Sequence, residues 1–241
     1  MTSTSKPEAL VLIPGLMSDT AVWRAQIDAL QSILPIVVID HGERDSLNAM
    51  AQHVLEQAPA YFALAGHSMG GRVAMEVMRQ AGSRVTHLAL IDTACRAIAN
   101  PEADAKEREI RFGFLDLAQK HGLERMARHW VQNMVHPDRL QDEVLIKSIT
   151  AMFARQSIAK YAAQINALLH RPDAFPLLSS IHCPTLVLCG REDASTTLAV
   201  HEEMMTALPN ASLVIVEHCG HMSMLEQPNG VTRAMVQWLA K

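Results

Sequence analysis

The stretch LAGHSMGGRV (residues 64–73) places three glycines around one serine, Ser68. An apolar run precedes the serine and a helical pattern follows it, so Ser68 stands at a predicted strand-to-helix turn. Glycine weakens strands and helices unless the backbone needs its freedom or its small size. We predict a sharp turn that holds Ser68 at positive φ as an exposed nucleophile, with Gly66 and Gly70 leaving space that a Cβ would fill and Gly71 admitting the helix close to the sheet. An ordinary glycine-containing turn is the alternative.

Short apolar runs alternate with helical patterns on both sides of this turn. The runs are dense in Val, Leu and Ile and lie at residues 9–13, 36–39, 61–65, 85–91, 185–190 and 212–217. Helical spacing of apolar residues occurs at 20–33, 46–58, 69–82 and 230–240. Continuous rather than alternating hydrophobicity is typical of strands buried on both faces. The chain is therefore predicted to be an α/β protein with a mostly parallel, doubly wound sheet, and Gly82 is expected to end the helix after Ser68.

The middle third of the chain breaks this alternation. It contains several amphipathic helical patterns with a turn near Pro137, and no strand-like run. An all-helical insertion cannot join the sheet, so it must lie against it. We predict an α/β core formed by residues 1–95 and 179–241 and a helical cap formed by residues 96–178, over the sheet edge where open α/β sheets bind ligands. A helical layer that only completes the core is the alternative.

A serine hydroxyl is a weak nucleophile without a base and an orienting acid. Among twelve histidines, His221 directly follows the last predicted strand and precedes the last helix, which places it at the same sheet edge as Ser68. His67 adjoins the serine, but the turn geometry is expected to direct neighbouring side chains apart. Asp193, in the loop after the preceding strand, is the predicted acid. Asp92, which ends another strand, is the alternative.

The chain resembles the α/β-hydrolase superfamily, in particular its small, cap-bearing, serine esterase-like branch. The resemblance extends over nearly the whole chain and rests on LVLIPGLMSDTAVW (10–23), GHSMGG (66–71), CPTLVLCGREDAST (183–196) and EHCGHMSMLEQP (217–228). Serine, aspartate and histidine follow one another in the order expected of this superfamily. Only a short polar segment precedes the first predicted strand, so the antiparallel hairpin that often opens this fold is expected to be absent. The segment DHGERDSL after the second strand is shorter and poorer in glycine than the superfamily's usual loop.

The same turn directs the main-chain N–H of Met69 toward the site where negative charge would develop. The resemblance implies that the loop after the first strand supplies a second oxyanion donor, here the N–H of Leu16. Most relatives carry a histidine that braces this loop where the chain has Pro14. Proline cannot form that hydrogen bond, although its fixed φ stiffens the turn. Met17 is expected to line the substrate pocket with an adaptable apolar side chain.

Composition limits the classes of partner. The 241 residues carry a net charge of −4, with 49% hydrophobic and 19% charged residues, which is typical of a globular domain without a basic surface for nucleic acid or anionic membranes. The sequence contains no secretory signal pattern, and no apolar run approaches the length of roughly 18 residues that a membrane span requires. Four cysteines without a CxxC pair are expected to be free, mostly buried thiols in a reducing cytoplasm. No complete zinc-ligand set or nucleotide-binding glycine loop is present.

These features predict a serine hydrolase that cleaves a small carboxylic ester through an acyl-enzyme intermediate and needs no cofactor. A small-molecule ester or related acyl compound is the expected partner. Hydrolysis of a thioester, a lactone or a carbon–carbon bond, and perhydrolysis, use the same residues and remain alternatives. A non-catalytic receptor for small molecules is a further alternative. No arginine is singled out as a carboxylate clamp, although Arg72, Arg111 and Arg128 are candidates.

Overall fold

The computed structural model describes residues 6–241, in which six strands form one sheet of order β2-β1-β3-β4-β5-β6. The strands are β1 (Ala9–Ile13), β2 (Ile36–Val38), β3 (Phe62–His67), β4 (Val85–Ile91), β5 (Thr185–Gly190) and β6 (Ala211–Val216). Every strand pair is parallel, so no antiparallel hairpin occurs within residues 6–241. All residues of β1, β3 and β5 are buried, as their continuous apolar runs predict. The predicted α/β fold is confirmed.

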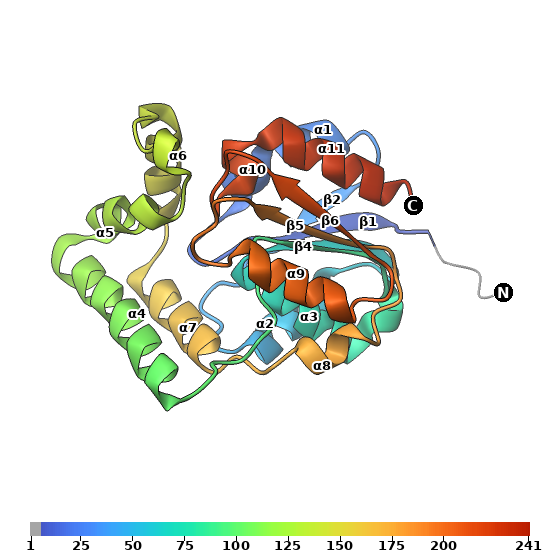
Figure 1. Cartoon of the computed structure of the whole chain (residues 1–241), viewed down its shortest axis with the longest axis horizontal. Coiled ribbons are helices and arrows are strands. Elements are labelled where there is room, and N and C mark those ends of the chain that lie inside the picture. The colour runs from blue at the N-terminus through green and yellow to red at the C-terminus, as the bar shows by residue number, and fades with distance from the viewer. Residues whose placement is uncertain (1–5) are drawn as a thin grey trace.

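Helices cover both faces of the sheet (Figure 1). One face carries α1 (Arg24–Leu30), α10 (Ser223–Glu226) and α11 (Pro228–Leu239). The other carries α2 (Leu47–Gln57), α3 (Met69–Ala81), α8 (Phe175–Leu178) and α9 (Leu198–Ala207). Gly82 caps the end of α3, as predicted. The helical pattern at 20–33 is divided, because Asp19 accepts a hydrogen bond from Ala21 and starts a separate 3₁₀ turn, η1 (Thr20–Trp23), before α1.

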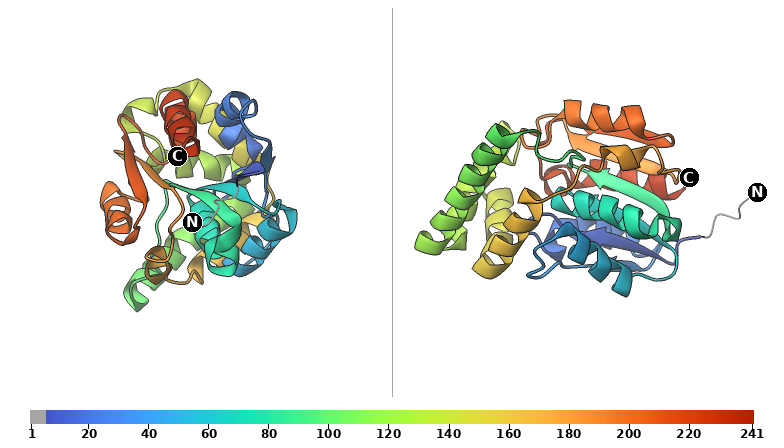
Figure 2. Two further views of the ribbon diagram at one scale, coloured as in Figure 1. Left: turned by 90° about the vertical axis from the view of Figure 1, so that its right-hand side faces the viewer. Right: turned by 90° about the horizontal axis from the view of Figure 1, so that it is seen from below.

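Four further helices gather beside the edge toward which the strands point (Figures 1 and 2). They are α4 (Pro101–His121), α5 (Leu123–Trp130), α6 (Glu143–Ala154) and α7 (Ile158–Leu169). Short 3₁₀ turns also occur at η2 (Gly82–Arg84), η3 (Val131–Asn133) and η4 (Pro137–Arg139). Side-chain caps start three of the four helices, because Asn100, Asp142 and Ser157 accept hydrogen bonds from the first turns of α4, α6 and α7. All four helices lie within residues 96–178, the segment predicted to form a cap, and after that prediction we refer to them as the cap helices.

The register of the sheet brings several strand ends to one level. Ile13 at the end of β1 pairs with Gly66 of β3, and His67 of β3 pairs with Ile91 of β4. The segments that follow β1, β3 and β4 therefore leave the sheet side by side, next to the cap helices. Among residues 6–241 no helix has the length and apolarity that crossing a membrane requires.

Candidate active site

Ser68 lies between β3 and α3 in a strained backbone conformation. Its φ is 52° and its ψ is −114°, a region that residues with a Cβ rarely occupy. Two contacts with the end of β4 hold the turn. The N–H of Ser68 donates to the carbonyl oxygen of Ile91 at 2.9 Å, and the hydroxyl of Thr93 donates to the carbonyl oxygen of Ser68 at 2.7 Å. The positive φ predicted for Ser68 is confirmed.

The glycines around Ser68 permit two close backbone approaches. A Cβ on Gly66 would collide with the carbonyl oxygen of Gly70, which lies across the turn. A Cβ on Gly70 would collide with the carbonyl oxygens of Ile13 and Pro14. The first turn of α3 therefore packs directly against the chain that leaves β1. This contact places the residue after Ser68 beside the loop that contains Leu16.

Ser68, His221 and Asp193 form one continuous chain of hydrogen bonds. Nε2 of His221 lies 2.8 Å from Oγ of Ser68, and Nδ1 of His221 lies 2.8 Å from Oδ2 of Asp193. Asp193 also accepts hydrogen bonds from the N–H groups of Ser195 and Thr196 at 2.8 and 2.9 Å, and from the Thr196 hydroxyl at 2.7 Å. His221 and Asp193 are each 3% exposed. The fold thus brings together three residues from loops far apart in the sequence.

The charges of this pair are set by burial and by mutual attraction. Burial alone would raise the pKa of Asp193, but His221 and the donors of Thr196 outweigh it and lower this pKa to about 2. Burial alone would lower the pKa of His221, but the charge and hydrogen bond of Asp193 outweigh it and raise this pKa. Asp193 is therefore anionic at neutral pH and accepts the Nδ1–H of His221. In the neutral imidazole, Nε2 then faces the Ser68 hydroxyl with its lone pair.

Asp92, the alternative acid, makes different contacts. Its carboxylate accepts the N–H of Gly190 at 3.0 Å through Oδ1 and the N–H of Ser223 at 3.2 Å through Oδ2. It is fully buried, and burial together with the nearby charge of Asp193 raises its pKa to about 8. Asp92 therefore ties the end of β5 to the start of α10, the two elements that flank the loops carrying Asp193 and His221. The sequence gives no sign of this bridging position.

His67 lies closer to His221 than the turn geometry suggested. Its Nε2 is 2.9 Å from the carbonyl oxygen of His221, and the two ring centroids are 5.2 Å apart. Burial and the neighbouring His221 lower the pKa of His67 to about 3, so the ring is neutral and donates through Nε2–H. The two residues are 154 positions apart, and no local pattern indicates their contact.

Two main-chain N–H groups beside Ser68 have no acceptor among residues 6–241: those of Leu16 and Met69. Met69 is the first residue of α3, where N–H groups lack partners within the helix. Leu16 is the second residue of a β-turn closed by a hydrogen bond of 3.1 Å from Ser18 N–H to the Gly15 carbonyl. Both residues are buried. The side chain of Met17 is also completely buried and belongs to the hydrophobic core.

Residues within 96–178 contact the loop after β1 and the loop after β6. The N–H of Met17 donates to Oε1 of Gln164 on α7 at 2.8 Å. The N–H of His221 donates to the carbonyl oxygen of Met134, which follows η3, also at 2.8 Å. Neither Gln164 nor Met134 is predicted from the sequence as part of the site. Their partners lie 147 and 87 residues away, so only the tertiary structure brings them to the site.

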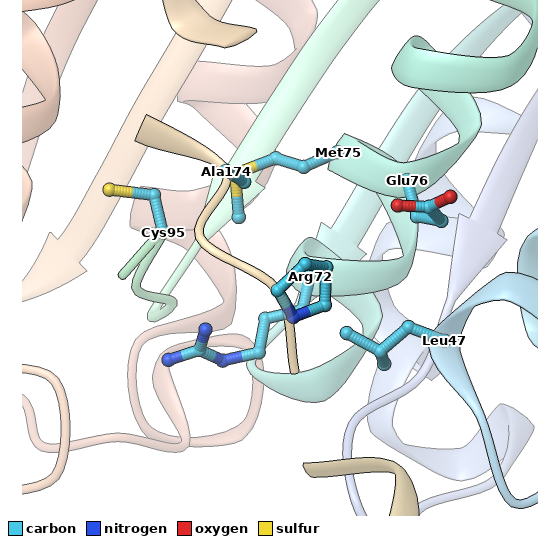
Figure 3. Close-up of a pocket in the computed structure, with 7 residues that line it drawn as sticks. Leu47, Arg72, Met75, Glu76, Cys95 and Ala174 are labelled. Atoms are coloured by element: carbon cyan, nitrogen blue, oxygen red, sulfur yellow. The ribbon is translucent and has the colours of Figure 1, made fainter. Parts of the chain in front are cut away.

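The three arginines considered as carboxylate clamps have partners within the protein. Arg111 pairs with Glu107 and Arg128 with Glu124, each one helical turn away. Arg72 lines a small pocket beneath the segment that follows α7 (Figure 3), and its guanidinium donates to the Arg96 carbonyl oxygen at 3.0 Å. Burial lowers the pKa of Arg72 to about 9. This pocket is lined by Leu47, Arg72, Met75, Glu76, Cys95, Pro172 and Ala174 and includes none of the Ser68–His221–Asp193 chain.

No cluster of three or more His, Cys, Asp or Glu side chains suited to a metal ion occurs in the part of the chain that the structure describes, residues 6–241. All four cysteines are free. Three are buried, and Cys183 is partly buried. Burial raises the pKa of Cys95 to about 11 and that of Cys189 to about 12, so these thiols are protonated at neutral pH. They are therefore poor nucleophiles in comparison with a serine that contacts a histidine.

A model of the alpha/beta hydrolase family matches residues 10–234, which include Ser68, Asp193, His221 and all of the sheet but Ala9. The protein belongs to the alpha/beta hydrolase family. Among the relatives of this hydrolase is the pimeloyl-[acyl-carrier protein] methyl ester esterase of Nitrosomonas europaea. It is 25% identical, and the alignment covers 94% of this chain and 93% of the relative.

Two further relatives of this hydrolase show how broadly the family's reactions vary. The (E)-2-((N-methylformamido)methylene)succinate hydrolase of Acinetobacter baylyi is 26% identical, with 96% of this chain and 90% of the relative covered. A thermophilic esterase from Thermogutta terrifontis has a similar structure, with a TM-score of 0.86 and 26% identity, covering 98% of this chain and 90% of that one. All three names describe hydrolytic enzymes, and the two names that state the compound cleaved state different compounds.

Proposed function

We propose that this hydrolase is a serine esterase that cleaves a small carboxylic ester through an acyl-enzyme intermediate. The observation that carries the proposal is the hydrogen-bonded chain from Ser68 Oγ through His221 to Asp193. Its geometry suits the transfer of a proton from serine to histidine while an anionic carboxylate stabilises the charge that forms on the ring. Two of the relatives described above are named as esterases.

In the first step, Oγ of Ser68 attacks the ester carbonyl while Nε2 of His221 takes the serine proton. Asp193 keeps the imidazole oriented and stabilises its charged form. The N–H groups of Leu16 and Met69, which have no acceptor within residues 6–241, hold the oxyanion of the tetrahedral intermediate. The intermediate collapses when His221 returns its proton to the leaving alkoxide, which departs as an alcohol.

In the second step, His221 takes a proton from a water molecule that attacks the acyl-Ser68 carbonyl. Collapse of this second intermediate releases the carboxylic acid and returns the proton to Ser68. No external oxidant, reductant or metal ion is needed to balance either step. The cap helices would cover the substrate at the strand ends and select its acyl chain, with residues 96–178 forming a cap over a core of residues 1–95 and 179–241.

Labelling with a fluorophosphonate probe tests the nucleophile. The wild-type protein is expected to gain the mass of one phosphonyl group on Ser68, and Ser68→Ala is expected to gain none. A panel of nitrophenyl esters, lactones and thioesters of increasing acyl length then identifies the bond and the chain length preferred. Folded wild-type protein that neither reacts with the probe nor hydrolyses any member of the panel would contradict the proposal.

A matched pair of variants tests which carboxylate is the acid. Asp193→Asn is expected to lower kcat by about 10⁴, because the amide no longer holds the imidazole in the required tautomer. Asp92→Asn removes one hydrogen bond from a bridging residue and is expected to lower kcat by about tenfold or less. Equal losses in the two variants, or a larger loss in Asp92→Asn, would reassign the role of acid.

A further inference from the structure

The β-turn that contains Leu16 has an unusual conformation at its third residue. Met17 has a φ of 57°, in the left-handed region, and the turn is closed by the hydrogen bond from Ser18 N–H to the Gly15 carbonyl. A positive φ at this position is that of a type II turn, which favours glycine or asparagine. A methionine is disfavoured there, so contacts from outside the turn must help to hold this conformation.

One such contact comes from the cap helix α7. Oε1 of Gln164 accepts the Met17 N–H at 2.8 Å, and the Gln164 side chain is almost completely buried. In Figures 1 and 2, α7 lies between α4 and the core, and Gln164 belongs to this helix. The Met17 N–H belongs to the peptide that joins Leu16 to Met17. Relaxation of Met17 to negative φ would rotate this peptide and turn its N–H away from Gln164.

We propose that Gln164 is a positioning residue for the oxyanion site: its side-chain carbonyl fixes the Leu16–Met17 peptide and thereby the direction of the Leu16 N–H. This inference rests on the proposed function. Pro14, which precedes the turn, has neither an N–H nor a polar side chain with which to brace it. The acceptor therefore comes from the cap, and the cap is required to complete the catalytic geometry as well as to cover the substrate.

Further contacts show that α7 is fixed relative to this loop. Arg155 and Gln156, which lie between α6 and α7, both donate to the carboxylate of Asp19, at 2.9 and 3.2 Å. One turn before Gln164, Lys160 forms an ion pair of 2.6 Å with Asp40, in the loop after β2. These contacts, all N-terminal to Gln164, anchor the start of α7 to the core, so that the amide of Gln164 reaches Met17 from an anchored helix.

Three variants separate this role from a general effect on packing. Gln164→Met has similar length and volume but no acceptor oxygen. Gln164→Glu retains an acceptor oxygen whether or not it is ionised. Asn166→Ala is the matched control, because it removes a different hydrogen bond between α7 and the core, from Asn166 Nδ2 to the Asp45 carbonyl, and leaves the turn untouched.

The measurements are kcat and KM for a nitrophenyl ester and the inhibition constant of a trifluoromethyl ketone, whose hemiketal oxyanion occupies the same site. Gln164→Met is expected to lower kcat by about 10- to 100-fold, to change KM by less than about twofold and to weaken the ketone by a factor similar to that for kcat. Gln164→Glu is expected to retain at least about one third of the wild-type kcat, and Asn166→Ala to resemble the wild type.

A Gln164→Met variant with unchanged kcat, or with a raised KM alone, would overturn the proposal. If Gln164→Met does not fold, Gln164→Asn, whose amide is one carbon too short to reach Met17, takes its place.

Hydrogen exchange gives a readout that does not depend on activity. In protein labelled with ¹⁵N-methionine, the Met17 amide is expected to exchange faster in Gln164→Met than in the wild type and to remain protected in Gln164→Glu. Equal protection in all variants would overturn the positioning role even in an active enzyme. A wild-type protein without esterase activity would contradict the proposed function, whereas the exchange experiment would still test the contact between Gln164 and Met17.

Discussion

Nε2 of His67 donates a hydrogen bond of 2.9 Å to the carbonyl oxygen of His221, so the residue before the proposed nucleophile holds the main chain of the proposed base. The ring of His67 also packs against Gly15, where a Cβ would lie 2.8 Å from Nδ1 of His67. One buried imidazole thus contacts the strand–helix turn, the loop after β1 and the loop after β6. The low pKa of His67, about 3, keeps the ring neutral throughout the working range of a hydrolase.

The first prediction concerns this contact. His67→Phe keeps an aromatic ring but leaves the His221 carbonyl without its donor, which is expected to cost about 1–3 kcal/mol in the free energy of unfolding. Because His221 is then less well placed, kcat is expected to fall by about tenfold or more. Urea unfolding and ester turnover measure the two effects. His87→Phe is the control, since His87 lies near the start of β4, whereas His67 lies at the end of β3. A similar loss of kcat in both variants would contradict a specific role for His67.

The second prediction concerns the pH dependence of catalysis. His221 must be neutral to accept the Ser68 proton, and Asp193 raises its pKa above the ordinary value of 6.5. The acid limb of the kcat/KM profile is therefore expected to have its midpoint above pH 6.5. In Asp193→Asn, the residual activity is expected to show a midpoint at lower pH, because the carboxylate that contacts the imidazolium and stabilises it most is then absent. An unchanged midpoint would show that Asp193 does not control the charge of His221.

The third prediction concerns stability and Asp92. Its pKa is about 8 in the folded protein and near 3.8 in the unfolded chain, so between these values the folded state holds a proton that the unfolded state has lost. The contribution of Asp92 to stability is fully present below about pH 4 and decreases as the pH rises to 8. Asp92→Asn does not titrate.

Urea unfolding of the wild type and Asp92→Asn at pH 5, 6, 7 and 8 measures this difference. The free energy of unfolding of the wild type is expected to fall relative to the variant by about 1 kcal/mol per pH unit. A difference that stays constant over this range would show that Asp92 is already ionised in the folded protein.

The fourth prediction compares two glycines. Gly70→Ala introduces a Cβ that collides with the carbonyl oxygens of Ile13 and Pro14, so α3 must move away from the loop that contains Leu16. Both kcat and Tm are expected to fall. Gly113→Ala, in the middle of α4, meets nothing within 4 Å and is expected to raise stability by about 0.5–1 kcal/mol without changing kcat. A loss of kcat in Gly113→Ala, or none in Gly70→Ala, would contradict this reading of the turn.

Much of the fold can be predicted from the sequence because its signals are local. The apolar runs of β1, β3 and β5 are continuous because both faces of those strands are buried, and the helices α4, α6 and α7 begin at residues whose side chains cap them. The strained conformation of Ser68 is also encoded locally, since only glycine fits at Gly66 and Gly70. Most bounds of strands and helices differ from expectation by no more than two residues, whereas the pattern at 20–33 divides into η1 and an α1 that already ends at Leu30.

The contacts within the candidate site are harder to predict from local sequence patterns. Strand ends indicate that Ser68, His221 and both Asp92 and Asp193 lie at one edge of the sheet, but they do not say which carboxylate contacts the histidine. Loop conformation decides this, because two N–H groups and a hydroxyl hold Asp193 beside Nδ1 of His221. The loops place Asp92 against the N–H groups of Gly190 and Ser223.

Local sequence is enough to predict the α/β architecture, the turn at Ser68 and the candidate residues at the strand ends, because steric and periodic constraints act between near neighbours in the chain. The packed fold is needed to establish that Asp193 contacts His221, that His67 holds the His221 carbonyl and that Gln164 accepts the Met17 N–H. These hydrogen bonds join groups 28 to 154 residues apart. Such groups meet only when the sheet and the cap helices have packed, so their pairing depends on the whole fold rather than on any local pattern.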